Sequence, residues 1–213
     1  MKLKINVPND LGEIKLSDYV KYLKVVEVNE NDSNSDVFVH QKVLEIFCGV
    51  PLLDAVEYRM SDIRKVVAII TNTLNKQPDL VRTFKLGDTE FGFIPKLDDM
   101  TFGEYVDLDS NLGNWDNMYK AMAVLYRPIK QKVGDKYIIE EYKGDLYYDA
   151  MIHTPMDAVI SSMVFFYNLG KELSVAMTKY LEEEGMLEDS MLSQTSLISG
   201  DGISQYKHLA NLM

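Results

Sequence analysis

The sequence predicts an α+β fold: a mostly helical single domain with an N-terminal strand and two small antiparallel hairpins. Apolar residues recur at helical spacing in several long segments, and they alternate with polar residues at the N-terminus. Two Gly-Asp pairs each lie between short segments that alternate in the manner of strands. We therefore expect residues 1–185 to form one globular domain and residues 186–213 to form a flexible C-terminal segment.

The first expected elements are a strand and a short helix. Residues 1–8, MKLKINVP, alternate apolar and polar side chains, which is typical of a half-buried strand. A proline and turn-forming residues then end the strand. Ser17 is a candidate N-cap for a helix that buries Tyr19, Val20 and Leu23.

A pair of helices is expected after a polar loop over residues 29–36. Asp36 can cap the first helix, and Gly49 followed by Pro51 ends it, because glycine adopts the left-handed conformation common at helix ends. Apolar residues at helical spacing predict the second helix over about residues 61–74.

Two hairpins are predicted from turn residues between alternating segments. The first turn is Gly87-Asp88 in LVRTFKLGDTEFGFIP, and the second is Gly134-Asp135 in IKQKVGDKYIIEEYKGD. Glycine supplies the left-handed turn conformation and aspartate tolerates turns, so each pair favours a tight reversal of the chain.

Two further helices are predicted near the middle of the chain. Thr101 and Glu104 have capping-box spacing, in which each side chain accepts a hydrogen bond from the other residue's backbone N–H, so a brief helix starts there. Asn114 can cap the helix in NWDNMYKAMAVLYRPI, whose apolar residues share one face and which Pro128 ends.

A long helix is predicted in the last third of the chain. Thr154, Pro155 and Asp157 supply an N-cap, a proline at the first helical position and an acid in the first turn. We expect the helix to reach about residue 184, with an interruption or bend near Gly170.

Composition limits the classes of function. The formal net charge is −11 and the sequence pI about 4.7, with no Lys/Arg cluster, which disfavours binding to nucleic acid or to an anionic membrane. The single cysteine, Cys48, cannot form an intramolecular disulfide or a multi-cysteine zinc site, and we expect it to be a small buried hydrophobe. Because no secretory signal or membrane-spanning segment is apparent, we expect a soluble protein in a reducing cytoplasm.

The sequence contains no convincing catalytic or metal-binding motif. Residues 107–118 begin like a calcium loop, but Gly113 stands one place late and Met118 replaces the required bidentate glutamate. The three histidines, His40, His153 and His208, have no metal-ligand spacing. We therefore predict no catalytic residues, no metal and no cofactor.

The aromatic helix in the middle of the chain has two interpretations. Met118, Met122 and Leu125 have the spacing of core residues. Aromatic and arginine side chains beside them have the composition of an interface hot spot, although core packing is the preferred interpretation. The residues of this candidate protein interface are Trp115, Tyr119, Tyr126 and Arg127.

The C-terminal segment contains a second candidate interface. Its end carries apolar residues at helical spacing, which is typical of a small helix that docks in a groove. A tail that folds back on its own domain explains the pattern equally well. The residues concerned are Ile203, Tyr206, Leu209 and Met213.

Several segments together resemble a group of tailed-bacteriophage proteins: tail assembly chaperones and small baseplate-associated proteins. The likeness covers roughly residues 38–173 and includes no active-site motif. It is carried by IFCGVP (46–51), DDMTFGEYVDLD (98–109), WDNMYKAMAVLYRPI (115–129), the hairpin with EEYKG (137–144) and FFYNLGKEL (165–173).

The resemblance implies a non-enzymatic morphogenesis protein that binds other phage structural or assembly proteins. The preferred hypothesis is a tail assembly chaperone acting in the host cytoplasm. One alternative is a permanent structural subunit of the tail or baseplate in the virion. Another is an enzyme or a host-directed inhibitor. Neither the partner nor the oligomeric state follows from the sequence.

Overall fold

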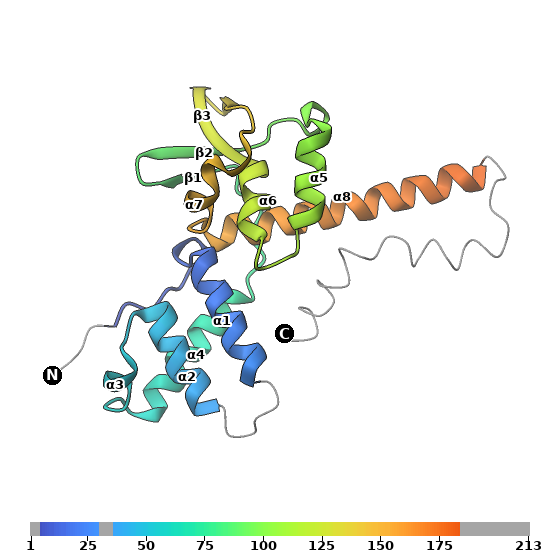
Figure 1. The fold of residues 1–213 in the computed structure, drawn as a ribbon. Coiled ribbons are helices and arrows are strands. Elements are labelled where there is room, and N and C mark those ends of the chain that lie inside the picture. Colours follow the sequence, from blue (N-terminus) through green and yellow to red (C-terminus); the bar gives the residue numbers. More distant parts are fainter. Residues whose placement is uncertain (1–4, 30–35, 184–213) are drawn as a thin grey trace.

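The computed structural model describes residues 5–29 and 36–183 of the chain (Figure 1). Helices come first, then a sheet whose strands are interrupted by two helices, and finally one long helix. The eight α-helices and four strands within the described residues confirm the mostly helical α+β fold.

The described residues before the first helix contain no strand, so the N-terminal strand prediction is wrong for residues 5–8. Ile5 instead packs against a small cluster between helices, and the Lys76 side chain donates a hydrogen bond to the Asn9 carbonyl oxygen. Alternation alone cannot supply the hydrogen-bonded neighbour that a strand needs. A 3-10 turn, η1 (Leu11–Glu13), follows.

Four helices gather at one end of the molecule (Figure 1). The N-cap expected at Ser17 is wrong, because α1 already begins at Leu16, where Lys15 pairs with Pro155 in an isolated bridge. The predicted end of α2 at Gly49 is confirmed, and Gly49 has φ +66°. The four helices are α1 (Leu16–Asn29), α2 (Asp36–Cys48), α3 (Leu52–Ala55) and α4 (Met60–Leu74).

Both predicted hairpins are present, and they join edge to edge into one antiparallel sheet of order β1-β2-β3-β4. Phe91 and Phe93 of the second strand pair with Pro128 and Tyr126 of the third, which makes the central contact between the hairpins. The strands are β1 (Thr83–Leu86), β2 (Thr89–Phe93), β3 (Tyr126–Val133) and β4 (Lys136–Ile139).

The helix predicted to end at Pro128 ends three residues earlier. Helix α6 (Met118–Leu125) passes directly into β3 at Tyr126, because the backbone of residues 126–128 is taken up by pairing with β2. Asn114 does not cap α6, since its side chain accepts from Asp116 N in the preceding turn. Six of the eight α6 side chains are buried, so this helix is the centre of the main core.

Smaller elements surround α6. Before it come the 3-10 turn η2 (Leu97–Asp99) and helix α5 (Phe102–Asn111), which begins with the predicted capping box. After the sheet, η3 (Gly144–Tyr147) and α7 (Tyr148–Met151) lead the chain back to α1.

The last described element, α8 (Met156–Glu183), is an unbroken helix, so the interruption expected at Gly170 is absent. The N-cap expected at Thr154 is also wrong, because its hydroxyl donates to the Met151 carbonyl oxygen, 2.7 Å away. The first turns of α8 are buried against η1 and α1, whereas its second half projects from the body of the protein (Figure 1).

Candidate protein-docking site

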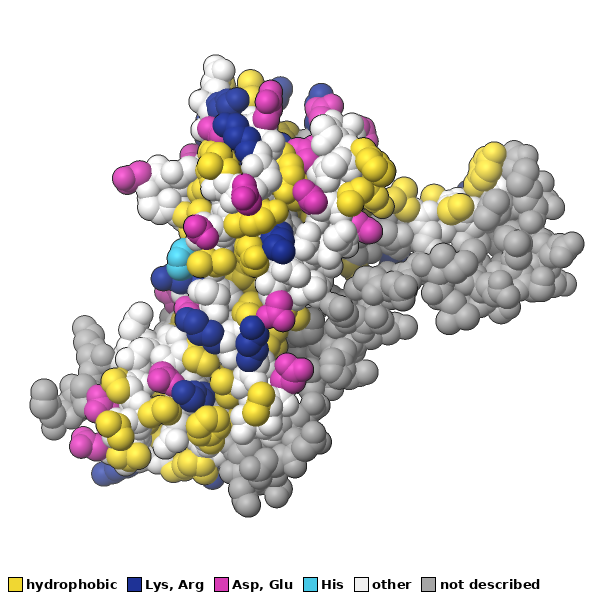
Figure 2. Space-filling model, viewed as in Figure 1, with side chains coloured by type: hydrophobic (Ala, Val, Ile, Leu, Met, Phe, Trp, Pro, Cys, Tyr) yellow, Lys and Arg dark blue, Asp and Glu magenta, His cyan; other side chains and the backbone are white. Residues whose placement is uncertain are grey.

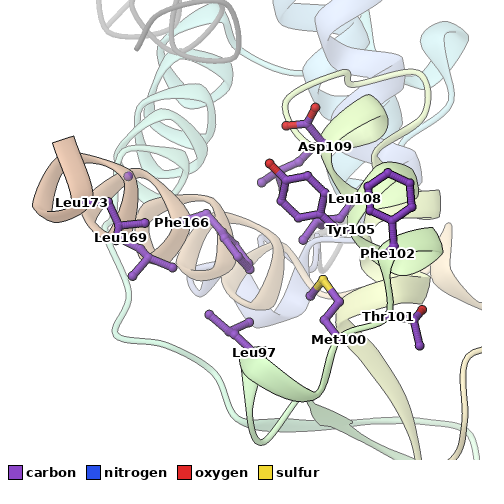
Figure 3. A pocket seen from close by; sticks show the side chains of 12 residues that line it. Leu97, Met100, Thr101, Phe102, Tyr105, Leu108, Asp109, Phe166, Leu169 and Leu173 are labelled. Carbon is purple, nitrogen blue, oxygen red and sulfur yellow. The ribbon is translucent and has the colours of Figure 1, made fainter. Parts of the chain in front are cut away.

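An apolar groove lies between α5 and α8, with a volume of about 680 Å³ (Figure 3). Phe102 and Tyr105 form the α5 wall, and Leu169 and Leu173 form the α8 wall. The groove is open to solvent: Phe102 is 82% exposed, Tyr105 56% and Leu173 63%. Its remaining lining residues are Leu97, Met100, Thr101, Leu108, Asp109, Leu112, Phe166 and Gly170.

The α5 wall is held in place by Glu104. Its Oε2 accepts from Thr101 N at 2.6 Å, which closes the capping box, and its Oε1 accepts from Arg127 Nη1 of β3 at 2.8 Å. Leu108 on the same helix is buried in the main core. With one face of α5 anchored in this way, Phe102 and Tyr105 stay exposed at the groove.

The α8 wall follows from helical spacing. Phe166, Leu169 and Leu173 are separated by three and four residues, so they lie on one face of the helix. Phe166 also contacts the core, with its ring 6.4 Å from that of Phe93. Figure 2 shows hydrophobic side chains gathered over α5 and along the projecting part of α8.

The composition of the groove suits apolar contact. Thr101, Asp109 and the Tyr105 hydroxyl supply the polar groups of its side chains. Across the described residues, no group of three or more His, Cys, Asp or Glu side chains is placed to hold a metal ion. The groove can therefore bury aromatic or aliphatic side chains of another polypeptide, a mode of recognition in which anchors at helical spacing fill a groove.

The predicted interface residues Trp115 and Tyr119 lie elsewhere, beside α1. Trp115 is half-buried, and its ring meets that of Tyr19 edge-on at 4.9 Å. Tyr119 packs edge-on against Tyr148 at 5.4 Å. Both line a hollow of about 240 Å³ with Val20 of α1, at whose rim Lys24 and Asp116 form an ion pair. An interface role for these two residues stays a prediction.

The interface prediction is wrong for Tyr126 and Arg127, because both are buried. Tyr126 has no exposed surface, and its hydroxyl donates to the Val81 carbonyl oxygen at 2.6 Å. Arg127 is 6% exposed and pairs with Glu104. Both residues belong to the start of β3 in the middle of the sheet, and neither offers area to a partner.

The second predicted interface lies outside the described residues. Its members are Ile203, Tyr206, Leu209 and Met213.

The other candidate reactive residues are dispersed. Asp107 and Asn111, from the calcium-like stretch, lie on α5, and Asp107 Oδ2 accepts from the Tyr142 hydroxyl at 2.9 Å. Cys48 is half-buried at the end of α2, and burial raises the pKa of its thiol to about 11. The thiolate is the nucleophilic form, so this burial disfavours reactivity of the thiol.

Sequence reasoning missed the groove although part of its signal was visible. Phe102 and Tyr105 are aromatic residues on a short helix rich in acids. The apolar spacing of α8 continues past Gly170, beyond the length that the core could cover. What could not be seen is that these two helices line the same groove.

None of the helices within the described ranges has the length and hydrophobicity that crossing a membrane requires.

No protein-family model, no curated protein and no solved structure matches the chain.

Proposed function

We propose that this chain is a non-enzymatic bacteriophage morphogenesis protein, a tail assembly chaperone that holds an apolar segment of another tail protein. The observation that carries the proposal is the open apolar groove between α5 and α8. A chaperone of this kind needs contact area that excludes water from its client, and it needs no reactive group.

The composition of the groove fits a helical client. Phe102 and Tyr105 are large aromatic side chains, which supply much of the binding energy at protein interfaces. Leu169 and Leu173 on the opposite wall offer aliphatic contact. A client helix with apolar residues at positions i, i+3, i+4 and i+7 would bury those residues between the two walls.

The resemblance supports the proposal at the same place in the chain. The segment DDMTFGEYVDLD, which resembles phage tail assembly proteins, includes Phe102 and Tyr105 of the α5 wall. The segment FFYNLGKEL includes Phe166, Leu169 and Leu173 of the α8 wall.

The experiment compares infected cells with purified particles. A tagged chain expressed during infection should co-purify with a helical tail protein and be missing from washed virions, as judged by mass spectrometry. Presence in virions at fixed stoichiometry would instead identify a structural subunit of the tail or baseplate. Recovery of no phage protein from the cells would contradict the proposal.

Variants in the groove test whether the client binds there. Phe102→Glu and Leu173→Glu should each reduce recovery of the client about tenfold or more, because a charge would be buried against apolar side chains. Both residues are well exposed, so folding should be preserved. Leu53→Glu on α3 is the matched control, since Leu53 is 85% exposed and lies outside the groove. Equal recovery with all three variants would exclude the groove as the client site.

A further inference from the structure

The projecting half of α8 continues the apolar surface beyond the groove. Phe166, Leu169, Leu173, Ala176 and Tyr180 are separated alternately by three and four residues, the repeat of a helix that pairs with another helix. Leu173 is 63% exposed and Tyr180 59% exposed. Exposed stripes of this kind mark interaction sites or aggregation liabilities.

Each edge of this stripe carries a complementary pair of residues one heptad apart. Along one edge are Glu172 and Lys179, which have opposite charges. Along the other edge are Gly170 and Met177, a residue without a side chain and a long flexible one. A Cβ atom at Gly170 would have no heavy atom within 4 Å, so there is open space above it, and Met177 is 64% exposed.

We propose that a second copy of this chain covers the stripe, with the two α8 helices antiparallel about a two-fold axis. Leu173 then packs on Ala176 of the partner subunit, and Tyr180 on Leu169 of the partner subunit. In the same register Glu172 meets Lys179 of the partner subunit, and Met177 fills the space above Gly170 of the partner subunit. The symmetry repeats each contact, as an isologous interface requires.

The self-pairing is favoured because four contacts fit in one register. Two are apolar layers, one joins opposite charges, and one places a large residue over a small one. A parallel pair would place identical residues at equal heights, so Glu172 and Lys179 of the partner subunit would lie a heptad apart along the helix axis and could not pair. The antiparallel register pairs Leu169, Leu173, Ala176 and Tyr180 and both flanking edges at once. It also carries the end of the partner's helix towards Phe102 and Tyr105, so each copy helps to fill the other's groove.

This inference does not depend on the proposed client. The pairing concerns the purified chain alone, and it gives the apolar surface a cover when no client is bound. Where both interactions occur they compete, because Leu169 and Leu173 belong to the groove and to the stripe.

The experiment is analytical ultracentrifugation of the full chain over a wide concentration range. We expect a concentration-dependent species of twice the 24.4 kDa chain mass. Glu172→Lys and Lys179→Glu should each weaken association about tenfold, because two attractive pairs per dimer become repulsive. The double variant Glu172→Lys/Lys179→Glu restores both pairs and should associate nearly as tightly as the original chain.

Lys171→Glu is the matched charge-reversal control, because Lys171 is exposed on the face of α8 opposite the stripe, and the change should leave association unchanged. Circular dichroism verifies that each variant is folded. A chain that stays at monomer mass throughout would overturn the proposal and indicate that another occupant, such as residues 184–213, covers the stripe. A double variant that associates as weakly as the single variants would also overturn the proposal.

Discussion

At the residue scale, the Arg127–Glu104 pair joins the sheet to the wall of the groove. The two side chains are 8% and 6% exposed, and their Nη1 and Oε1 atoms are 2.8 Å apart. Among the described buried side chains, Arg127 Nε has no hydrogen-bond partner. Burying the guanidinium therefore costs free energy of folding, and the Glu104 carboxylate is the group that compensates its charge.

Replacing Glu104 by glutamine tests this dependence. Glu104→Gln keeps the shape of the side chain but leaves the Arg127 charge uncompensated, so we expect the free energy of unfolding to fall by about 3–5 kcal/mol. Urea denaturation measures the change. Asp62→Asn breaks the Lys65–Asp62 pair, whose side chains are 74% and 55% exposed, and should cost about 1 kcal/mol or less. Equal losses of unfolding free energy in the two variants would refute the role of Glu104 in compensating the Arg127 charge.

At the scale of elements, the sheet depends on a close contact between β2 and β4. Tyr137 of β4 lies across Gly92 of β2, and its hydroxyl donates to the Phe93 carbonyl oxygen at 2.8 Å. A Cβ atom at Gly92 would lie 2.6 Å from Cε2 of Tyr137, well inside van der Waals contact. Since the hydroxyl holds the ring in place, the ring cannot move away without losing this hydrogen bond.

Gly92→Ala should therefore lower the free energy of unfolding by about 1–3 kcal/mol, the usual cost of overpacking. Gly103→Ala is the matched control in helix α5, where an added Cβ would meet no atom within 4 Å. There the change should raise stability by up to about 1 kcal/mol, because alanine loses less backbone entropy in a helix. Thermal unfolding of the two variants compares them directly, and shifts in the same direction would contradict this account.

At the scale of the whole molecule, the described chain has two hydrophobic clusters of unequal size. The main cluster surrounds α6 and includes residues from α1, the sheet and α8. The smaller one is formed by Leu44, Val50, Ala55 and Ile63 of the helical end. The ring contact between Tyr22 and Phe47, with centroids 5.5 Å apart, joins α1 to α2, and both rings pack against the main cluster.

The difference in size predicts that the helical end opens first. Leu44→Ala should destabilise α2 and α4 by about 2–5 kcal/mol and speed their amide hydrogen exchange, while exchange in α6 stays slow. Met122→Ala, at an equally buried position in α6, should speed exchange across the whole chain. Faster exchange in α6 after Leu44→Ala would show that the two clusters unfold together.

Local signals in the sequence were reliable where the structure is decided by neighbouring residues. Both hairpin turns, the capping box of α5 and the end of α2 at Gly49 lie where the turn and cap residues predict them. In each case the controlling interaction joins residues a few positions apart, such as the bond from Glu104 N to Thr101 Oγ1. Such interactions need no knowledge of the rest of the fold.

Predictions failed where distant residues compete for the same backbone or surface. Residues 126–128 continue the helical pattern of α6, but pairing with β2 makes them a strand. Arg127 has the composition of an interface residue, yet its carboxylate partner, Glu104, lies on α5 and holds it inside. Residues 5–8 alternate like a strand and have no strand beside them among the described residues.

By itself, the sequence determined the α+β class, both hairpin turns and the long helix in the last third of the chain, because periodicity and turn chemistry are local properties. Only the tertiary structure decided that α5 and α8 line one groove and that Arg127 is buried. The groove exists because packing around α6 buries the first half of α8, while the second half of this helix stays exposed. The division of a helix between core and solvent depends on every element packed against it.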